Sequence, residues 1–134
     1  MDKRYEILPH TADGKFRAYG RTLEEAFANA GLAMVSFMWE WERIRPRLLR
    51  SFDLGGRDRE QLLVRFLNEI IFLAESEGFL VGSFEGLRIE SGPDGLRLGA
   101  RLHGDLRSAG YEVFGEVKAA TYNEMRIEED GGFS

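Results

Sequence analysis

The feature that most constrains the fold of this chain is an amphipathic stripe between residues 58 and 78. Asp58 with Gln61 three residues later is typical of a helix N-terminus, and Gly78 is typical of a helix end. Apolar residues recur between these signals at helical spacing: Leu62, Leu63, Phe66, Leu67, Ile70, Ile71 and Ala74. A helix with such a wide apolar face must bury that face against another layer, so the stripe predicts a helix within a packed domain.

Residues 22–39 predict a second helix of the same kind. Thr22 and Glu25 have the spacing of a capping box, which favours a helix start at this point. The apolar face consists of Leu23, Ala26, Phe27, Ala30, Met34, Phe37 and Met38. Small residues such as Ala28 and Ala33 favour close packing on a sheet. The pattern places the helix end near Trp39.

The remaining pattern is typical of strands. Alternation predicts strands at 5–8, 15–20, 48–56, 79–90, 96–102, 111–118 and 122–128. Gly82 and Gly86 indicate bulges, and the run 92–95 (Gly-Pro-Asp-Gly) indicates a hairpin turn. The element order predicts one α+β domain over residues 1–134. We expect a two-layer sandwich in which both helices pack on one face of a mostly antiparallel sheet.

Composition excludes several functional classes. The chain has no cysteine, which excludes a disulfide scaffold, a thiolate metal site and a cysteine nucleophile, and which suits the cytoplasm. The N-terminus has no apolar segment and the uncharged run 26–39 is too short to span a bilayer, so no membrane association is expected. The net charge of −5 gives no general basis for binding a phosphate backbone, which favours action through a protein partner or a metal.

The turn His10-Thr11-Ala12-Asp13-Gly14 is the first candidate site. Asp13 is a hard oxygen ligand of the kind that Mg²⁺ or Ca²⁺ prefers, and His10 is a candidate base or ligand. The alternative is ordinary turn chemistry, in which Asp13 caps backbone N–H groups and Gly14 takes a positive φ. The residues alone leave both interpretations open.

Two further segments near the C-terminus carry candidates. Lys118 flanks a small-residue bend and is suited to hold a phosphate or an acidic group of a partner, but it is also an ordinary solvated lysine at a strand edge. The acidic run 128–130 offers oxygen ligands, among them Asp130, or forms a solvated turn.

Two other functional classes follow from the residues. A metal-dependent phosphoester hydrolase would use Asp13 with His10 or His103. A chaperone-like binding module would use an apolar rim at residues 38–41, which includes Trp39 and Trp41. The alternative for these two tryptophans is packing in the core or at its edge. Motifs for a phosphate-binding loop, a zinc protease or a nucleophile elbow are absent from the sequence.

Three blocks of the sequence together resemble the archease family, the small proteins that activate RtcB-type RNA ligases. They are HTADGKFRAYGRTLEEAFANAGLAMVSFM, LLVRFLNEIIFLAE and EVKAATYNEMRIE. The resemblance implies an α+β fold with two helices against a sheet. It also implies a protein cofactor rather than an enzyme, which promotes guanylylation and multiple turnover of the ligase in tRNA splicing and RNA repair.

The same resemblance implies site residues, a cofactor and partners. In the family, the aspartate of the H-T-A-D turn and an acid at the extreme C-terminus bind a divalent cation, which points here to Asp13 and, as the second ligand, Asp130. Lys118 corresponds to an essential basic contact, with His10, Thr121 and Tyr122 as further functional contacts. The implied cofactor is Ca²⁺ or Mg²⁺, GTP enters through the partner ligase, and tRNA is met through that ligase.

The chain departs from the family pattern in two places. Asn123 stands where the family has a histidine, so a role that needs an imidazole there is not expected. Archeases also continue past a D-G-x turn into a strand that ends in an aspartate, whereas this sequence stops after residues 130–134. We therefore expect a domain that lacks the final strand, with residues 128–130 as the nearest substitute for its acid.

Overall fold

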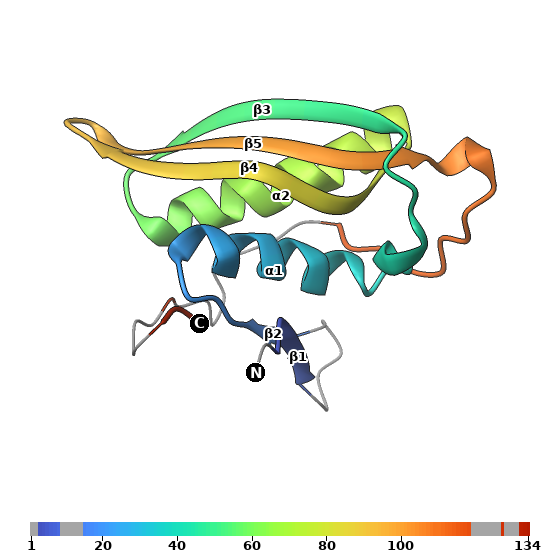
Figure 1. Ribbon diagram of the computed structural model, residues 1–134, viewed down its shortest axis with the longest axis horizontal. Helices are drawn as coiled ribbons and strands as arrows, with labels where there is room; N and C mark the ends of the chain where they lie inside the picture. The colour runs from blue at the N-terminus through green and yellow to red at the C-terminus, as the bar shows by residue number, and fades with distance from the viewer. Residues whose placement is uncertain (1–2, 9–14, 119–126, 128–131) are drawn as a thin grey trace.

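The computed structural model of the chain describes residues 3–8, 15–118, 127 and 132–134 (Figure 1). Two helices pack against antiparallel sheets, which confirms the predicted α+β class. The strands in the described residues form two sheets rather than one. β1 (Tyr5–Leu8) pairs with β2 (Lys15–Ala18), and β3 (Leu48–Gly56), β4 (Phe79–Gly92) and β5 (Gly95–Leu106) form a second sheet in the order β3-β5-β4.

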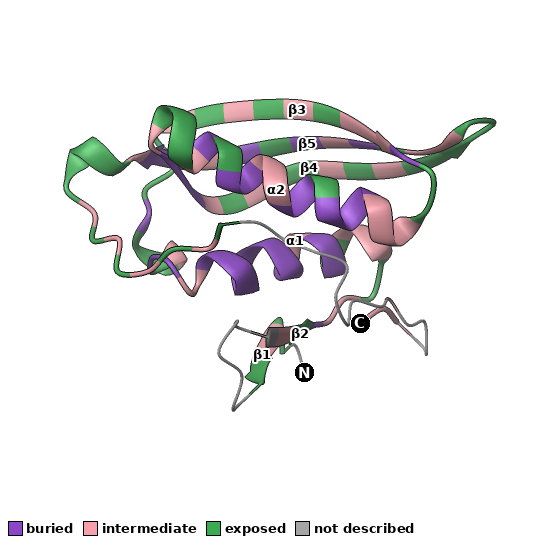
Figure 2. Cartoon of the chain, turned by 180° about the vertical axis from the view of Figure 1, so that it is seen from behind, coloured by how far each residue is buried: buried purple, intermediate pink, exposed green. Residues whose placement is uncertain are grey.

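The helix α1 (Leu23–Val35) lies between the two sheets, and α2 (Arg59–Glu77) packs beside it under the larger one (Figure 1). Buried residues follow both helices, whereas the strands of the larger sheet alternate in exposure along much of their length (Figure 2). One face of that sheet is therefore covered by the helices and the other faces solvent. No helix in the described part of the chain combines the length and apolarity that a membrane crossing requires.

Local chemistry accounts for both helix starts. The Thr22 hydroxyl accepts a hydrogen bond from the Glu25 amide at 3.1 Å, and Asp58 accepts one from the Gln61 amide at 2.8 Å. The helix α2 ends at Gly78, whose φ of 69° is the left-handed conformation that glycine tolerates best. These three predictions from the sequence are confirmed.

The first helix ends at Val35, four residues before the predicted end. The amides of Met38 and Trp39 still bond to the Val35 carbonyl, at 2.8 and 2.9 Å, but the chain turns there instead of continuing the helix. Trp39 is 1% exposed and its indole N–H donates to the Val81 carbonyl at 2.9 Å. Of the two alternatives for this segment, the apolar rim is therefore wrong at Met38 and Trp39, and core packing is confirmed, because both side chains are buried.

The hairpin of β4 and β5 follows the sequence prediction closely. Its register shifts between Val81 and Ser83 and again between Glu85 and Arg88, so Gly82 and Gly86 stand at the irregularities. The predicted strand at 111–118 is not formed, although its residues alternate in exposure and Val113 and Val117 pack on the core. A backbone hydrogen bond of 2.9 Å from the Phe114 N–H to the Met38 carbonyl joins this segment to the turn after α1. The predicted strand at 122–128 lies outside the described residues, apart from Ile127.

Candidate functional site

Most of the residues proposed from the sequence lie outside the described part of the chain. These residues are His10, Asp13, Thr121, Tyr122, Asn123 and Asp130. Lys118 is described: its side chain is exposed and it follows Val117, which packs on the core. This position suits a contact with another molecule.

The C-terminal residues lie beside the strand that follows the candidate turn. Gly20, just after β2, pairs with Phe133 through two backbone hydrogen bonds of 2.9 and 2.6 Å. Gly20 is required here because a Cβ at this position would lie 2.2 Å from the Ala26 amide nitrogen in the first turn of α1. The pairing joins segments more than a hundred residues apart in the sequence.

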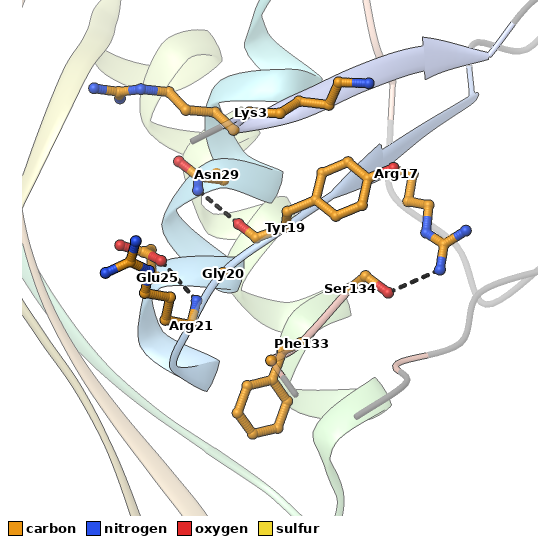
Figure 3. Close-up of a pocket in the computed structure, with 11 residues that line it drawn as sticks. Lys3, Arg17, Tyr19, Gly20, Arg21, Glu25, Asn29, Phe133 and Ser134 are labelled. Atoms are coloured by element: carbon orange, nitrogen blue, oxygen red, sulfur yellow. Dashed lines mark hydrogen bonds between the residues drawn. The ribbon is translucent and has the colours of Figure 1, made fainter. Parts of the chain in front are cut away.

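A pocket of about 860 Å³ opens at this junction of β2, α1 and the C-terminus (Figure 3). Four basic residues line it, and its remaining lining is mostly polar or backbone. The basic residues are Lys3, Arg4, Arg17 and Arg21. Glu25 is the only acidic side chain among the described lining residues, and one of its oxygens accepts a hydrogen bond from the Arg21 amide at 2.6 Å.

Tyr19, the residue that follows β2, organises one side of this pocket. The Lys3 ammonium and the Arg17 guanidinium lie 5.9 and 5.6 Å from the Tyr19 ring centroid, within the range of cation–π attraction. The Tyr19 carbonyl accepts a hydrogen bond of 2.7 Å from the amide of Asn29, a buried residue of α1. The hydroxyl of Tyr19 donates to Glu6; this bond lowers the pKa of Glu6, with Lys3 also contributing, and raises the pKa of Tyr19. Hydrogen bonds therefore hold both the backbone carbonyl and the hydroxyl of Tyr19.

His103 lies on the solvent-facing side of the larger sheet, between the inward residues Leu102 and Gly104. Its ring nitrogen is hydrogen-bonded to Glu85, and that bond, followed by the nearby charge of Arg101, lowers the pKa of Glu85. Within residues 3–8, 15–118, 127 and 132–134, no group of three or more metal-ligating side chains gathers. His103 is thus a member of a cross-strand polar cluster with Glu85 and Arg101.

A buried carboxylate at the end of β5 was not singled out from the sequence. Asp105 is 5% exposed and accepts hydrogen bonds from the Leu106 amide at 2.8 Å and the Tyr111 hydroxyl at 2.9 Å, with Arg47 at 3.6 Å. Burial raises the pKa of Asp105, but these hydrogen bonds and the charge of Arg47 together bring it below the ordinary value. Asp105 therefore anchors the segment after β5. The sequence does not predict that this aspartate is buried, because its side chain is polar.

We expect Asp105→Asn to lower the melting temperature by several degrees at pH 7. A lowered pKa in the folded state stabilises the protein above the ordinary aspartate pKa, and this contribution is lost as the pH falls through the folded-state value. The difference from the unmodified chain should therefore shrink below about pH 4. Thermal unfolding at several pH values measures this, with the exposed turn variant Asp94→Asn as the control. If the difference in melting temperature between the two proteins were the same at low pH, the charge of Asp105 would not contribute to stability.

Comparison with known proteins links this fold to one family. The family description "Archease protein family" matches residues 5–134. The chain is 40% identical over 127 residues to Protein archease of Thermococcus gammatolerans, covering 94% of this chain and 89% of that protein. It is 39% identical to Protein archease of Methanosarcina barkeri, with coverages of 93% and 86%. The solution structure of Methanobacterium thermoautotrophicum protein 1598 is similar with a TM-score of 0.84 and 36% identity, and covers 97% of this chain and 93% of that one.

Proposed function

The chain belongs to the archease family, and from this premise we propose that it is a protein cofactor that activates an RtcB-type RNA ligase. The observation that carries the proposal is the family match over residues 5–134, which includes all three sequence blocks of the resemblance. The proposed role is to promote guanylylation of the ligase from GTP and so to support repeated turnover in tRNA splicing and RNA repair. The proposed place of action is the cytoplasm.

We further propose that Asp13 binds a divalent cation, Ca²⁺ or Mg²⁺, with Asp130 as the second protein ligand. Carboxylate oxygens are the donors that both of these hard cations prefer. The proposal is supported by the pairing of Gly20 with Phe133, because it puts residues shortly after Asp130 beside the strand that begins shortly after Asp13. Such a cation would neutralise negative charge on a triphosphate during nucleotidyl transfer.

Lys118 is the proposed basic contact with the ligase or its nucleotide. Its exposure leaves the ammonium accessible, and the packing of Val117 and Val113 on the core fixes the backbone that carries it. A lysine ammonium held in this way is suited to a carboxylate or phosphate of the partner. His10, Thr121 and Tyr122 are proposed as further contacts on the strength of the family blocks alone.

A ligation assay with a cognate RtcB-type ligase tests this function. With the ligase limiting, we expect the chain to raise both the fraction of guanylylated ligase and the number of RNA joins per ligase molecule. An unrelated protein at the same concentration serves as the control. If both quantities stay at their values without the chain, the proposed function is wrong.

A further inference from the structure

We propose that the outer edge of β3 is a self-association surface, where a second copy of this chain adds its own β3 antiparallel to the first. The inference goes beyond the proposed function, because it concerns two copies of the chain and no ligase. It rests on an open strand centre, at Ser51 and Asp53, beside an exposed aromatic side chain of α2, Phe72. Two-fold pairing at this edge joins two three-stranded sheets into one of six strands.

The two edges of the larger sheet differ in how they are covered. On β4, the Val81 carbonyl accepts a hydrogen bond from the Trp39 indole N–H at 2.9 Å. Further along β4, the Ile89 amide donates to the Glu24 carboxylate at 3.2 Å. The opposite edge is β3, and Figure 1 shows no other described strand beside its outer side. Because an open edge is where another strand adds most readily, β3 is the edge available for pairing.

The hairpin between β4 and β5 determines which backbone groups of β3 point outward. Two residues separate Gly92 from Gly95, and the pair that closes a two-residue loop is hydrogen-bonded. Bonding alternates along β5, so its odd-numbered residues bond to β4 and its even-numbered residues bond to β3. Even-numbered residues of β3 are the partners of the latter. The residues whose N–H and C=O groups point outward are therefore the odd-numbered ones, Leu49, Ser51, Asp53 and Gly55.

Arginine side chains cover only the two ends of this edge. The Arg50 guanidinium donates to the Leu49 carbonyl at 3.1 Å, and the Arg65 guanidinium donates to the Gly55 carbonyl at 2.5 Å. Both bonds agree with the outward direction of the odd-numbered residues. For the two outward residues between them, no group in the described part of the chain bonds to the N–H or C=O. Four backbone groups at the strand centre are therefore open to a partner.

Phe72 of α2 lies beside the centre of the same edge. Arg65 reaches Gly55, and Arg50 donates to Glu77 at 2.8 Å, so the helix runs antiparallel to the strand. These contacts span about 18 Å of helix and about 17 Å of strand, at roughly 1.5 Å and 3.4 Å per residue. On this scale Phe72 is level with the middle of β3, and it shares a helix face with Arg65, two turns before it. Its side chain is 56% exposed.

The pairing register is self-complementary when the two-fold axis passes through Phe52. Ser51 then lies opposite Asp53 of the second copy, and Asp53 opposite its Ser51, so like charges do not meet. These two pairs exchange four backbone hydrogen bonds through the open groups. The same axis brings the exposed Phe72 rings of both copies towards each other, which favours their burial. A second copy supplies both features by symmetry, and this is why we assign it as the occupant.

Sedimentation velocity of the chain alone tests the proposal. The contact is small, so we expect a weak dimer with a dissociation constant of about 10–100 μM. The sedimentation coefficient should therefore rise from the monomer value towards the dimer value between about 1 μM and about 1 mM. Unfolding measured at the lower concentration reports on the monomer, in which Phe72 is exposed.

Matched variants test the register and the aromatic contact. Ser51→Asp places two like-charge pairs beside the axis and should weaken association at least about fivefold at low ionic strength. Ser51→Lys places opposite charges there and should keep or tighten association. Phe72→Ala should weaken it at least about fivefold. The control is Phe114→Ala, which removes a phenylalanine of 54% exposure beside the turn after α1 and should stay within about twofold.

Amide hydrogen exchange, measured by NMR on the unmodified chain, locates the surface without any variant. Exchange at Ser51 and Asp53 should slow at least about threefold from dilute to concentrated protein, whereas exchange at Phe52, which faces β5, should not change. The proposal is overturned by a monomer at about 1 mM, by association without slower exchange at these two amides, or by equal losses within either pair of variants. Because no ligase is present, these outcomes are independent of the ligation assay.

Discussion

Phe66→Ala is expected to lower the free energy of unfolding by about 3–5 kcal/mol, a large part of the stability of a domain of this size. The Phe66 side chain is 0% exposed. Its ring centroid lies 5.7 Å from that of Phe27 in α1, 6.2 Å from that of Phe52 in β3 and 5.5 Å from that of Phe84 in β4. Truncation would thus remove contacts with three elements at once and leave a cavity between both helices and the sheet. Urea denaturation followed by circular dichroism measures the loss.

The same helix offers a matched control. Phe72 is 56% exposed, so Phe72→Ala removes the same group without opening a cavity and should change the free energy of unfolding by less than about 0.5 kcal/mol. Both variants raise the intrinsic helix propensity slightly, because alanine is the best helix former, so propensity explains no loss of stability in either. Equal losses in the two variants would show that the aromatic cluster does not hold the layers together.

The elements that were predictable from the sequence are those that local chemistry determines. Asp58 with Gln61 and Gly78 define both ends of α2, because a cap and a left-handed glycine need only their neighbours. The β4–β5 hairpin is similar, since its turn lies between Gly92 and Gly95 and its irregularities lie at two further glycines. Periodicity and capping are sufficient for such elements.

The structure differs from the sequence prediction where contacts between distant segments determine the backbone. The apolar pattern of α1 continues past Val35 because Met38 and Trp39 are core residues, although the backbone there has already turned. Residues 111–118 alternate in exposure, as a strand would, but a strand also needs a ladder partner, and none is formed in the described residues. The division of the strands into two sheets likewise depends on pairings that no local pattern specifies.

The pocket at the junction of β2, α1 and the C-terminus could not be predicted from the sequence for the same reason. Lys3, Arg17 and Arg21 are separated in the sequence by residues of other kinds and form no motif. They line one pocket because β1 pairs with β2, and the pairing of Gly20 with Phe133 adds the C-terminal residues to its lining. By contrast, Asp13 lies in one short polar turn that is also part of a family block, so the sequence alone singles it out, and its role as a cation ligand stays a prediction.

Asp13→Ala is expected to reduce activation of the ligase by at least about 10–100-fold, since even changes around a metal's ligands cost this much affinity. The reason is that a hard cation needs several oxygen donors, and loss of one of two carboxylates leaves too few protein ligands to hold it. The melting temperature without added metal should change little. With Ca²⁺ or Mg²⁺ in excess, the unmodified chain should become more stable by about 2.7 kcal/mol at 100 times the dissociation constant, and the variant should not.

Asp94→Ala is the control, because Asp94 is an exposed aspartate in the β4–β5 turn and carries the same change of charge. It should keep both the activation and the stabilisation by metal. A large loss of stability in metal-free Asp13→Ala would instead indicate that Asp13 caps its turn through backbone hydrogen bonds. Loss of activation together with unaltered stabilisation by metal would separate the two roles, because the cation would then be held elsewhere while Asp13 contacts the ligase directly.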